Sequence, residues 1–135
     1  MATPIADIEG IGPAYEAKLK DAGVTSVEKL LEMGGASKGR DALATATGIS
    51  GKLLLTWVNH ADLFRIKGVA GQFAELLEAA GVDTVPELAQ RNAANLVAKM
   101  TEVNAAKNLT KGAITESQVQ KWIDEAKTLP KAVSH

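Results

Sequence analysis

Residues 8–30 read IEGIGPAYEAKLKDAGVTSVEKL, and residues 66–88 read IKGVAGQFAELLEAAGVDTVPEL. The two stretches match at a constant offset of 58 residues, which pairs Gly10 with Gly68 and Gly23 with Gly81. Matches at a fixed spacing indicate an internal repeat. The sequence therefore predicts two copies of one helical unit.

Each copy is predicted to contain a turn, a helix, a second turn and another helix. In the first copy, Gly10 permits the positive φ of a tight turn, and Pro13 suits the first position of a helix. The 3.6-residue spacing predicts a helix from Pro13 to about Ala22, and Gly23 stands where a helix C-terminus favours glycine. The side of this helix expected to face inward consists of Ala14, Tyr15, Ala17, Leu19 and Ala22.

The pattern apolar-x-Gly-apolar-Gly, followed by a helix that ends in Ala-Gly-Val, resembles the helix-hairpin-helix motif. From about residue 5 to 129, the chain resembles a tandem helix-hairpin-helix family described as domain of unknown function 4332. The resemblance implies an all-α fold in which two pseudo-symmetric helix-hairpin-helix repeats pack as one compact domain over residues 1–135. We expect repeat one at about 5–64, repeat two at about 65–129, and a frayed tail at 130–135.

Length and composition agree with a globular helical protein. The chain has 135 residues, of which 46% are hydrophobic and 23% charged, and this balance is typical of one folded domain. Aromatic residues make up only 4%, so we expect a core of Leu, Val, Ile and Ala. The N-terminus lacks a signal-peptide pattern and no apolar run approaches membrane-spanning length, so we expect a cytoplasmic protein that does not contact membranes.

Polar residues before apolar runs predict where the other helices begin. Gly34-Gly35 is expected to break the helix that precedes it, and residues 1–4 are expected to form a loose leader. The predicted caps are Ser26 or Thr25, Ser37, Ser50, Asn92 and Thr115. Trp57 and Trp122 are expected to occupy equivalent core positions, although their offset of 65 indicates a longer second copy.

The glycine turns are the first candidate site. A hairpin turn can offer backbone N–H groups to a phosphate, helped by the N-terminus of the following helix. The candidate contact residues are Gly10, Ile11 and Gly12 in the first copy and Gly68, Val69 and Gly71 in the second. Because Ala70 replaces the second glycine, we expect closer phosphate approach at the first turn. The alternative interpretation is that the glycines only form the turn.

Basic residues near the turns are the second candidate. Those expected to border the first turn are Lys18, Lys38, Arg40 and Lys52, and those flanking the second are Arg65 and Lys67. The alternative is an ordinary solvated surface. Net charge is −1 overall, −2 in residues 1–64 and +1 in residues 65–135, so neither half is a polycation. Charge alone therefore does not favour nucleic-acid binding, which is driven mainly by phosphate neutralisation.

Residues 43–58 offer a weaker alternative, because a helix, Gly48-Ile49 and a capped helix resemble a helix-turn-helix. Ser50, Gly51, Lys52 and Thr56 would then meet base edges in the major groove. The apolar run Leu53–Leu55 favours a core helix instead.

Catalytic chemistry has little support. The chain has no cysteine, which excludes disulfides, thiolate catalysis and cysteine-based metal centres. His60 and His135 are the two histidines, and His60 has no partner at metal-ligand spacing. We therefore expect no enzyme activity, metal or cofactor.

The leading expectation is a non-enzymatic module that binds nucleic-acid backbone weakly, without sequence preference and with strong salt sensitivity. The competing expectation is a protein-interaction or assembly module, which the charge of −1 favours. A third possibility is a small anionic ligand held at a turn or between the repeats. The sequence indicates no oligomeric state.

Overall fold

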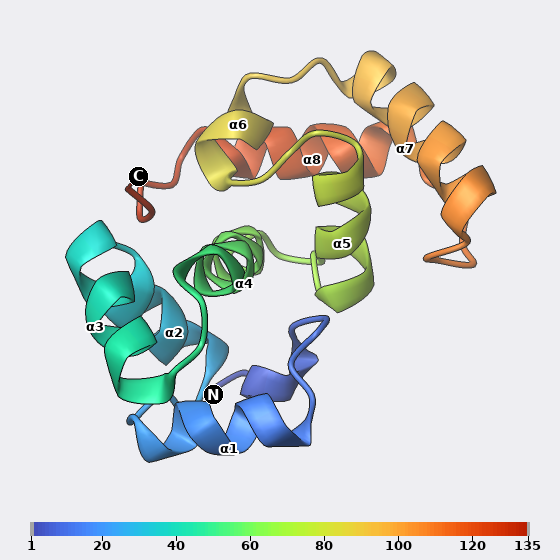
Figure 1. The fold of residues 1–135 in the computed structure, drawn as a ribbon. Coiled ribbons are helices and arrows are strands. Elements are labelled where there is room, and N and C mark those ends of the chain that lie inside the picture. Colours follow the sequence, from blue (N-terminus) through green and yellow to red (C-terminus); the bar gives the residue numbers. More distant parts are fainter. Residues whose placement is uncertain (1, 135) are drawn as a thin grey trace. The chain divides into compact units, whose positions relative to one another are not determined.

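The computed structural model describes residues 2–134, which form helices and no β-strand (Figure 1). The all-α class predicted from the sequence is confirmed. The elements in chain order are the 3-10 helix η1 (Ile5–Asp7) and the α-helices α1 (Pro13–Asp21), α2 (Val27–Gly34), α3 (Ser37–Thr47), α4 (Gly51–Leu63), α5 (Gly71–Ala79), α6 (Val85–Ala89), α7 (Ala93–Lys107) and α8 (Glu116–Ala126). No helix of the described residues is long and apolar enough to cross a bilayer.

The chain divides into two compact units. The first reaches Asp62 and includes the tail from Ala132, and the second runs from Leu63 to Lys131. The division at Asp62 lies two residues from the boundary that the sequence repeat predicts. The packing of both repeats as one domain stays a prediction.

The sequence repeat is accompanied by a repeat of local backbone geometry. Helices α1 and α5 begin and end at the same offset of 58 residues. Gly10 and Gly68 have φ of +93° and +91°, a left-handed conformation that residues with a Cβ rarely adopt. Each helix also ends in the same way, because the N–H groups of Val24 and Val82 donate to the carbonyls five residues earlier at 2.8 Å. This is the hydrogen bond of a Schellman motif.

The offset rises from 58 to 65 at the tryptophans through two insertions in the second copy, although the stretch from the start of α6 to the start of α7 is two residues shorter than the stretch from α2 to α3. Helix α7 contains 15 residues where α3 contains 11. The loop after α7 spans residues 108–115, whereas the loop after α3 spans only residues 48–50. The side chain of Asn104 holds the longer loop, since its Oδ1 accepts from the N–H groups of Leu109 and Thr110 at 2.8 and 3.0 Å.

Most predicted caps are confirmed. The side chains of Ser26, Ser50, Asn92 and Thr115 each accept a hydrogen bond from the N–H three residues later. The predicted cap Ser37 is wrong by one residue, because α3 already includes Ser37 and its N-cap is Ala36. Gly35 still has helical φ and ψ as the C-cap of α2, so Ala36 alone redirects the chain between the two helices.

The cores are aliphatic, as the composition predicts. The second unit buries a cluster that includes Leu76, Leu77, Leu88, Leu96, Val119, Ile123 and Trp122. The predicted inward side of α1 is mostly wrong, because Leu19 is its one buried residue and Ala14, Tyr15 and Ala17 are exposed. A nine-residue helix with a single large aliphatic side chain anchors itself through that side chain and leaves the alanines in solvent.

The N-terminal residues that the structure describes do not form the loose leader that the sequence predicts. The Thr3 N–H donates to Glu28 Oε1 at 2.8 Å, and its hydroxyl donates to Oε2 at 2.7 Å. The Val27 N–H in turn donates to the Thr3 carbonyl at 2.9 Å. These bonds fasten the first residues to the start of α2.

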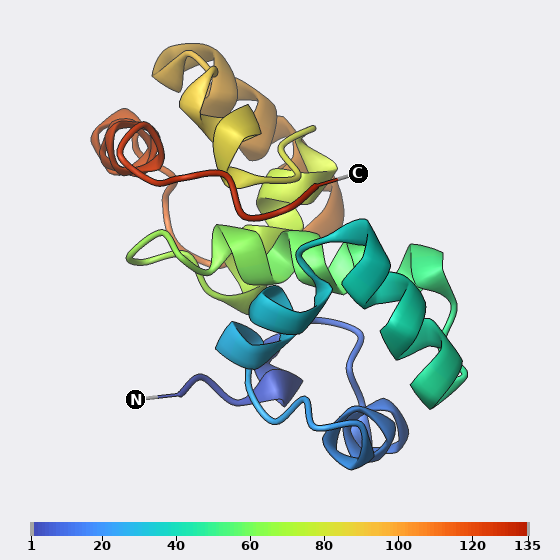
Figure 2. The ribbon, with the colours of Figure 1, turned by 90° about the vertical axis from the view of Figure 1, so that its left-hand side faces the viewer.

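The predicted frayed tail is also corrected. Val133 is 3% exposed, and the Ser134 N–H donates to the Gly35 carbonyl at 2.8 Å. The Arg40 guanidinium donates to the Ser134 carbonyl as well, so this end of the chain belongs to the first unit (Figure 2). A buried apolar side chain and backbone hydrogen bonds hold it there, although His135 lies outside the described residues.

Candidate functional site at the glycine turns

The two glycine turns are built alike. The Ile11 N–H donates to the Ile8 carbonyl at 3.2 Å, and the Val69 N–H donates to the Ile66 carbonyl at 3.1 Å. Ile11 and Val69 are buried, whereas Gly10 and Gly68 lie at the surface. Each turn is thus anchored by the apolar residue that follows its glycine. The expected phosphate contacts at Ile11 and Val69 are therefore corrected, because these residues are buried and their N–H groups already donate within the turn. The backbone of each glycine remains exposed.

A tryptophan supports each turn from inside its unit. A Cβ placed on Gly10 would lie 3.3 Å from Trp57 Nε1, and one on Gly68 would lie 3.4 Å from Trp122 Nε1. Trp57 meets Tyr15 edge to face at 5.0 Å between ring centroids, and Trp122 meets Phe73 in the same way at 5.1 Å. The predicted equivalence of the tryptophans is therefore confirmed in their local contacts.

Each turn leads directly into a helix whose N-terminus has no side-chain cap. The N-cap residues are Gly12 for α1 and Ala70 for α5. The first N–H groups of a helix have no partner within the helix, so both starts present donors to an acceptor. Pro13 removes one donor from α1, whereas Gly71 retains it in α5.

The backbone gives no steric reason to favour the first turn. Gly12 has φ −89° and ψ −177°, and Ala70 has φ −123° and ψ −169°, which are extended conformations open to any residue. A Cβ added at Gly12 meets no atom within 4 Å. The alanine at position 70 therefore fits the same backbone that the glycine adopts.

The predicted basic residues fall into different environments. Lys38, Lys52 and Lys67 are exposed, and Lys18 is exposed in the last turn of α1, away from the turn that precedes this helix. Arg65 is half-buried.

The prediction for Arg40 as a surface cation is wrong, because its side chain is 6% exposed. Its guanidinium donates to the carbonyls of Gly34 at 2.9 Å and Gly35 at 2.8 Å. Arg40 therefore closes the C-terminus of α2, where the carbonyls lack helical partners. The Thr56 hydroxyl of the helix-turn-helix alternative likewise donates within α4, to the Lys52 carbonyl at 3.2 Å.

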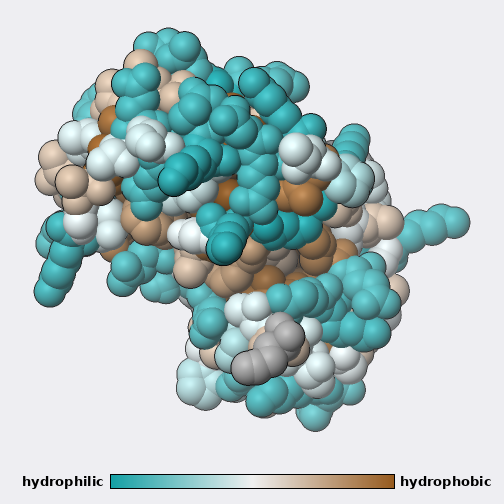
Figure 3. Space-filling model, turned by 180° about the vertical axis from the view of Figure 1, so that it is seen from behind, coloured by the Kyte–Doolittle hydropathy of each residue, from teal (hydrophilic) through white to brown (hydrophobic). Residues whose placement is uncertain are grey.

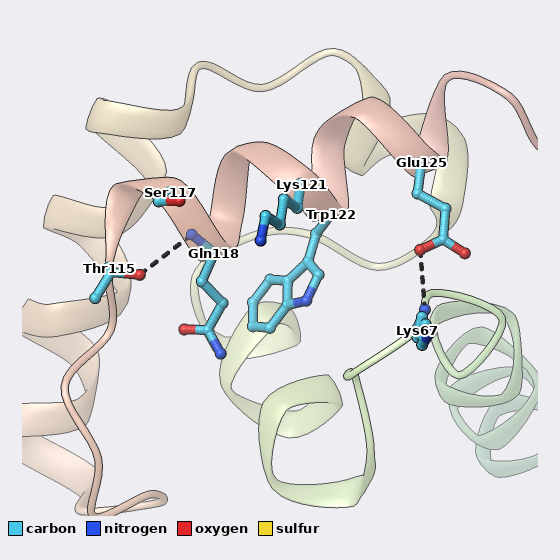
Figure 4. Close-up of a pocket in the computed structure, with 7 residues that line it drawn as sticks. All are labelled: Lys67, Thr115, Ser117, Gln118, Lys121, Trp122 and Glu125. Atoms are coloured by element: carbon cyan, nitrogen blue, oxygen red, sulfur yellow. Dashed lines mark hydrogen bonds between the residues drawn. The ribbon is translucent and has the colours of Figure 1, made fainter.

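A groove of about 390 Å³ lies beside the second turn. Its lining residues are Lys67, Thr115, Ser117, Gln118, Lys121, Trp122 and Glu125 (Figure 4). The Lys67 N–H donates to Glu125 Oε1 at 3.1 Å, which joins the turn to α8. Trp122, at 3% exposure, contributes only a small part of its indole to the groove surface.

The sequence identifies Lys67 as a site residue but misses Lys121. The two lysines are brought together by packing between the turn and α8, and no short sequence pattern encodes that contact. One sequence signal does point to Lys121, namely the equivalence of the two tryptophans. Since Trp57 belongs to α4 and Trp122 to α8, this equivalence indicates that α8 lies beside the second turn as α4 lies beside the first. Lys121 directly precedes Trp122, so this equivalence could have identified it.

A second hollow of about 350 Å³ lies in the same unit, between Gln72 at the start of α5 and the loop from Asn108 to Gly112. Within residues 2–134, no three His, Cys, Asp or Glu side chains gather into a group that could hold a metal ion.

No curated protein and no solved structure matches the chain. A family model described as Domain of unknown function (DUF4332) matches residues 9–129, which contain both glycine turns and all eight α-helices of the described chain. The chain therefore belongs to the family of this domain of unknown function.

Proposed function

We propose that the protein is a non-enzymatic binding module of the helix-hairpin-helix type, which contacts nucleic-acid backbone through its glycine turns. The observation that supports this most directly is the left-handed glycine followed by an uncapped helix start, which occurs in both units. Backbone N–H groups and the positive end of a helix dipole attract phosphate oxygens. Contacts of this kind position a nucleic acid but carry no sequence information.

The charge and the buried aromatic residues define the expected mode of binding. The net charge of −1 gives the protein no overall excess of cations, so we expect few phosphate contacts and weak binding that falls with salt. Trp57 and Trp122 are 1% and 3% exposed, and neither offers a ring face on which a base can stack. Binding therefore depends on the phosphate backbone.

The test is fluorescence anisotropy with labelled duplex and single-stranded DNA, at low salt and at about 0.15 M. Two variants, Gly12→Asp and Ala70→Asp, place a carboxylate at the N-cap of α1 or α5. Aspartate is a favourable N-cap residue, so both variants should fold. Its carboxylate accepts from the same N–H groups that a phosphate would use and repels the phosphate, so binding should weaken at the turn that is used.

Gly12→Ala is the matched control, because it adds a side chain at the same position without a charge or an acceptor. It should bind as the unaltered protein does. Unchanged binding in both aspartate variants would exclude the turns as the contact. No binding to either DNA at low salt would exclude the nucleic-acid function for this chain.

A protein-interaction or assembly module is the second candidate, and the overall charge of −1 favours it. Among the described residues, Tyr15 is the large hydrophobic residue that is exposed, at 37%. Figure 3 shows hydrophilic side chains over much of one face, with hydrophobic areas between them. Failure to bind DNA at low salt, together with a stable complex of defined mass recovered from solution, would favour this candidate.

A further inference from the structure

We infer that the two turns are not equivalent in binding: the turn at Gly68, together with the groove along α8, is the nucleic-acid contact, and the turn at Gly10 is structural. This inference rests on the proposed function and names the part of the molecule that performs it. It reverses the preference for the first turn that the sequence pattern of glycines suggests.

The residues before each glycine carry opposite charges. Residues 7–10 read DIEG, and residues 65–68 read RIKG. At the repeat offset of 58, Asp7 and Glu9 in the first unit stand where Arg65 and Lys67 stand in the second. Asp7 and Glu9 are both exposed, and two carboxylates beside a turn repel a phosphate that approaches its N–H groups. At the second turn Arg65 is half-buried and already interacts within the protein, so the exposed Lys67 is the cation that attracts a phosphate. The local backbone is the same in both units, so charge is the main difference between them.

The groove along α8 extends this positive surface. Lys121 lines it together with Lys67, and the position equivalent to Lys121 in the first unit is Thr56. Both lysines are exposed, and among the described residues neither forms an ion pair. Two ammonium groups thus border one groove and remain available to successive phosphates.

Acidic residues near the groove only partly offset this charge. Glu125 is the one carboxylate that lines the groove, so the two lysines outnumber it; its Oε1 also accepts from the Lys67 N–H at 3.1 Å. Glu75 and Glu78 lie about one and two helical turns beyond the start of α5, outside the lining residues. In the first unit, Lys52 stands at the position of Ser117, so one lysine lies near the position equivalent to the groove.

Neutral donors complete the site in the second unit. The hydroxyls of Thr115 and Ser117 and the amide of Gln118 line the groove, and all three groups can donate to phosphate oxygens. The first residue of α5, Gly71, adds a backbone N–H donor at the helix start. The corresponding residue of the first unit, Pro13, has no N–H. The turn, the lysines and these donors belong to one unit, so the contact needs no particular placement of the other.

The deciding experiment compares two double variants of the full chain by anisotropy with labelled duplex DNA. Lys67→Glu with Lys121→Glu reverses the charge at the second turn. Lys18→Glu with Lys52→Glu makes the same change in net charge in the first unit and is the matched control. We expect the first pair to weaken binding about tenfold or more and to reduce the salt slope by about two, while the control pair retains most of the affinity.

A gain-of-binding variant tests the same inference from the other side. Asp7→Arg with Glu9→Lys gives the first turn the charges of the second. This variant should bind the duplex more tightly than the unaltered protein and show a steeper salt dependence. The same or weaker affinity would overturn the claim that flanking charge distinguishes the turns.

The outcomes separate the inference from the proposed function. Equal losses in the two double variants, or a larger loss in the control pair, would overturn the inference and leave nucleic-acid binding intact. No binding by the unaltered protein at low salt would overturn both. All four lysines are exposed, and circular dichroism with thermal unfolding checks that each variant retains its helices.

Discussion

The two glycines of the turn motif have different physical roles. Gly10 has φ +93°, and a Cβ there would lie 3.3 Å from the Trp57 indole nitrogen. Gly12 has an extended backbone and open space where its side chain would be. The first glycine is therefore needed for the shape of the turn, and the second leaves room at the helix start without being required for folding.

This difference predicts unequal effects of alanine. Gly10→Ala should lower the free energy of unfolding by about 1–3 kcal/mol, because the residue must hold a left-handed conformation against the indole. Gly12→Ala should change it by less than about 0.5 kcal/mol. Urea denaturation measures both, and equal losses in the two variants would contradict the assignment of roles.

The lowered pKa of Glu28 leads us to predict that the stability of the protein depends on pH. Burial raises the pKa of its carboxyl, but the hydrogen bonds from the Thr3 hydroxyl and N–H outweigh this and hold the pKa below its ordinary value. A carboxyl with a lowered pKa in the folded state stabilises the protein above its ordinary pKa. That contribution is lost as the pH falls through the folded-state value.

Glu28→Gln should therefore be less stable than the unaltered protein near neutral pH, by less than about 1 kcal/mol because the side chain is exposed. The difference should shrink as the pH falls through the lowered pKa of Glu28, because both side chains are then uncharged. Thermal unfolding of the two proteins across this range measures it. A gap that stays constant with pH would show that the ionised carboxyl contributes nothing.

At the scale of elements, the C-terminal tail is a structural part of the first unit. It passes so close to Gly35 that a Cβ there would lie 2.4 Å from the Ala132 carbonyl. Arg40 joins the tail to the end of α2, and Val133 is buried. Two distant parts of the sequence, residues 35–40 and residues 132–134, therefore depend on each other.

Deletion of residues 132–135 should destabilise the first unit by about 1.5–3 kcal/mol, since a buried valine side chain is lost and Arg40 loses an acceptor. Ser134→Ala is the control, because Ser134 makes these hydrogen bonds through its backbone N–H and carbonyl. It should change stability by less than about 0.5 kcal/mol. An equally small effect of the deletion, measured by urea denaturation, would show that the tail does not contribute.

At the scale of the whole molecule, the sequence predicts features that depend on neighbouring residues. The repeat, the caps at Ser26 and Asn92, and the helix end at Gly23 follow from local propensities. The docking of the tail, the burial of Arg40 and the placement of Lys67 and Lys121 along one groove depend on contacts between distant residues. The candidate site was therefore only half predicted: its turn is visible in the sequence, and its groove is not.

The chain passes between the units twice, at Leu63, which is the last residue of α4, and again at Ala132. Since the first unit contains residues from both ends of the described chain, with the second unit inserted between them, we predict that the units unfold together. Trp57→Phe and Trp122→Phe each leave one tryptophan, which reports on a single unit by fluorescence. The fluorescence midpoint of each variant should coincide with its own helix-loss midpoint from circular dichroism. Separate midpoints within a variant would show that the units unfold as independent domains.

The most direct test of backbone binding is the affinity of the unaltered protein for labelled duplex DNA as a function of salt. The logarithm of the association constant should fall linearly with the logarithm of salt concentration, with a slope of about −2 to −3 for two or three neutralised phosphates. Lys67→Glu with Lys121→Glu should reduce that slope. No binding at low salt, or an affinity that does not change with salt, would contradict phosphate binding by this protein.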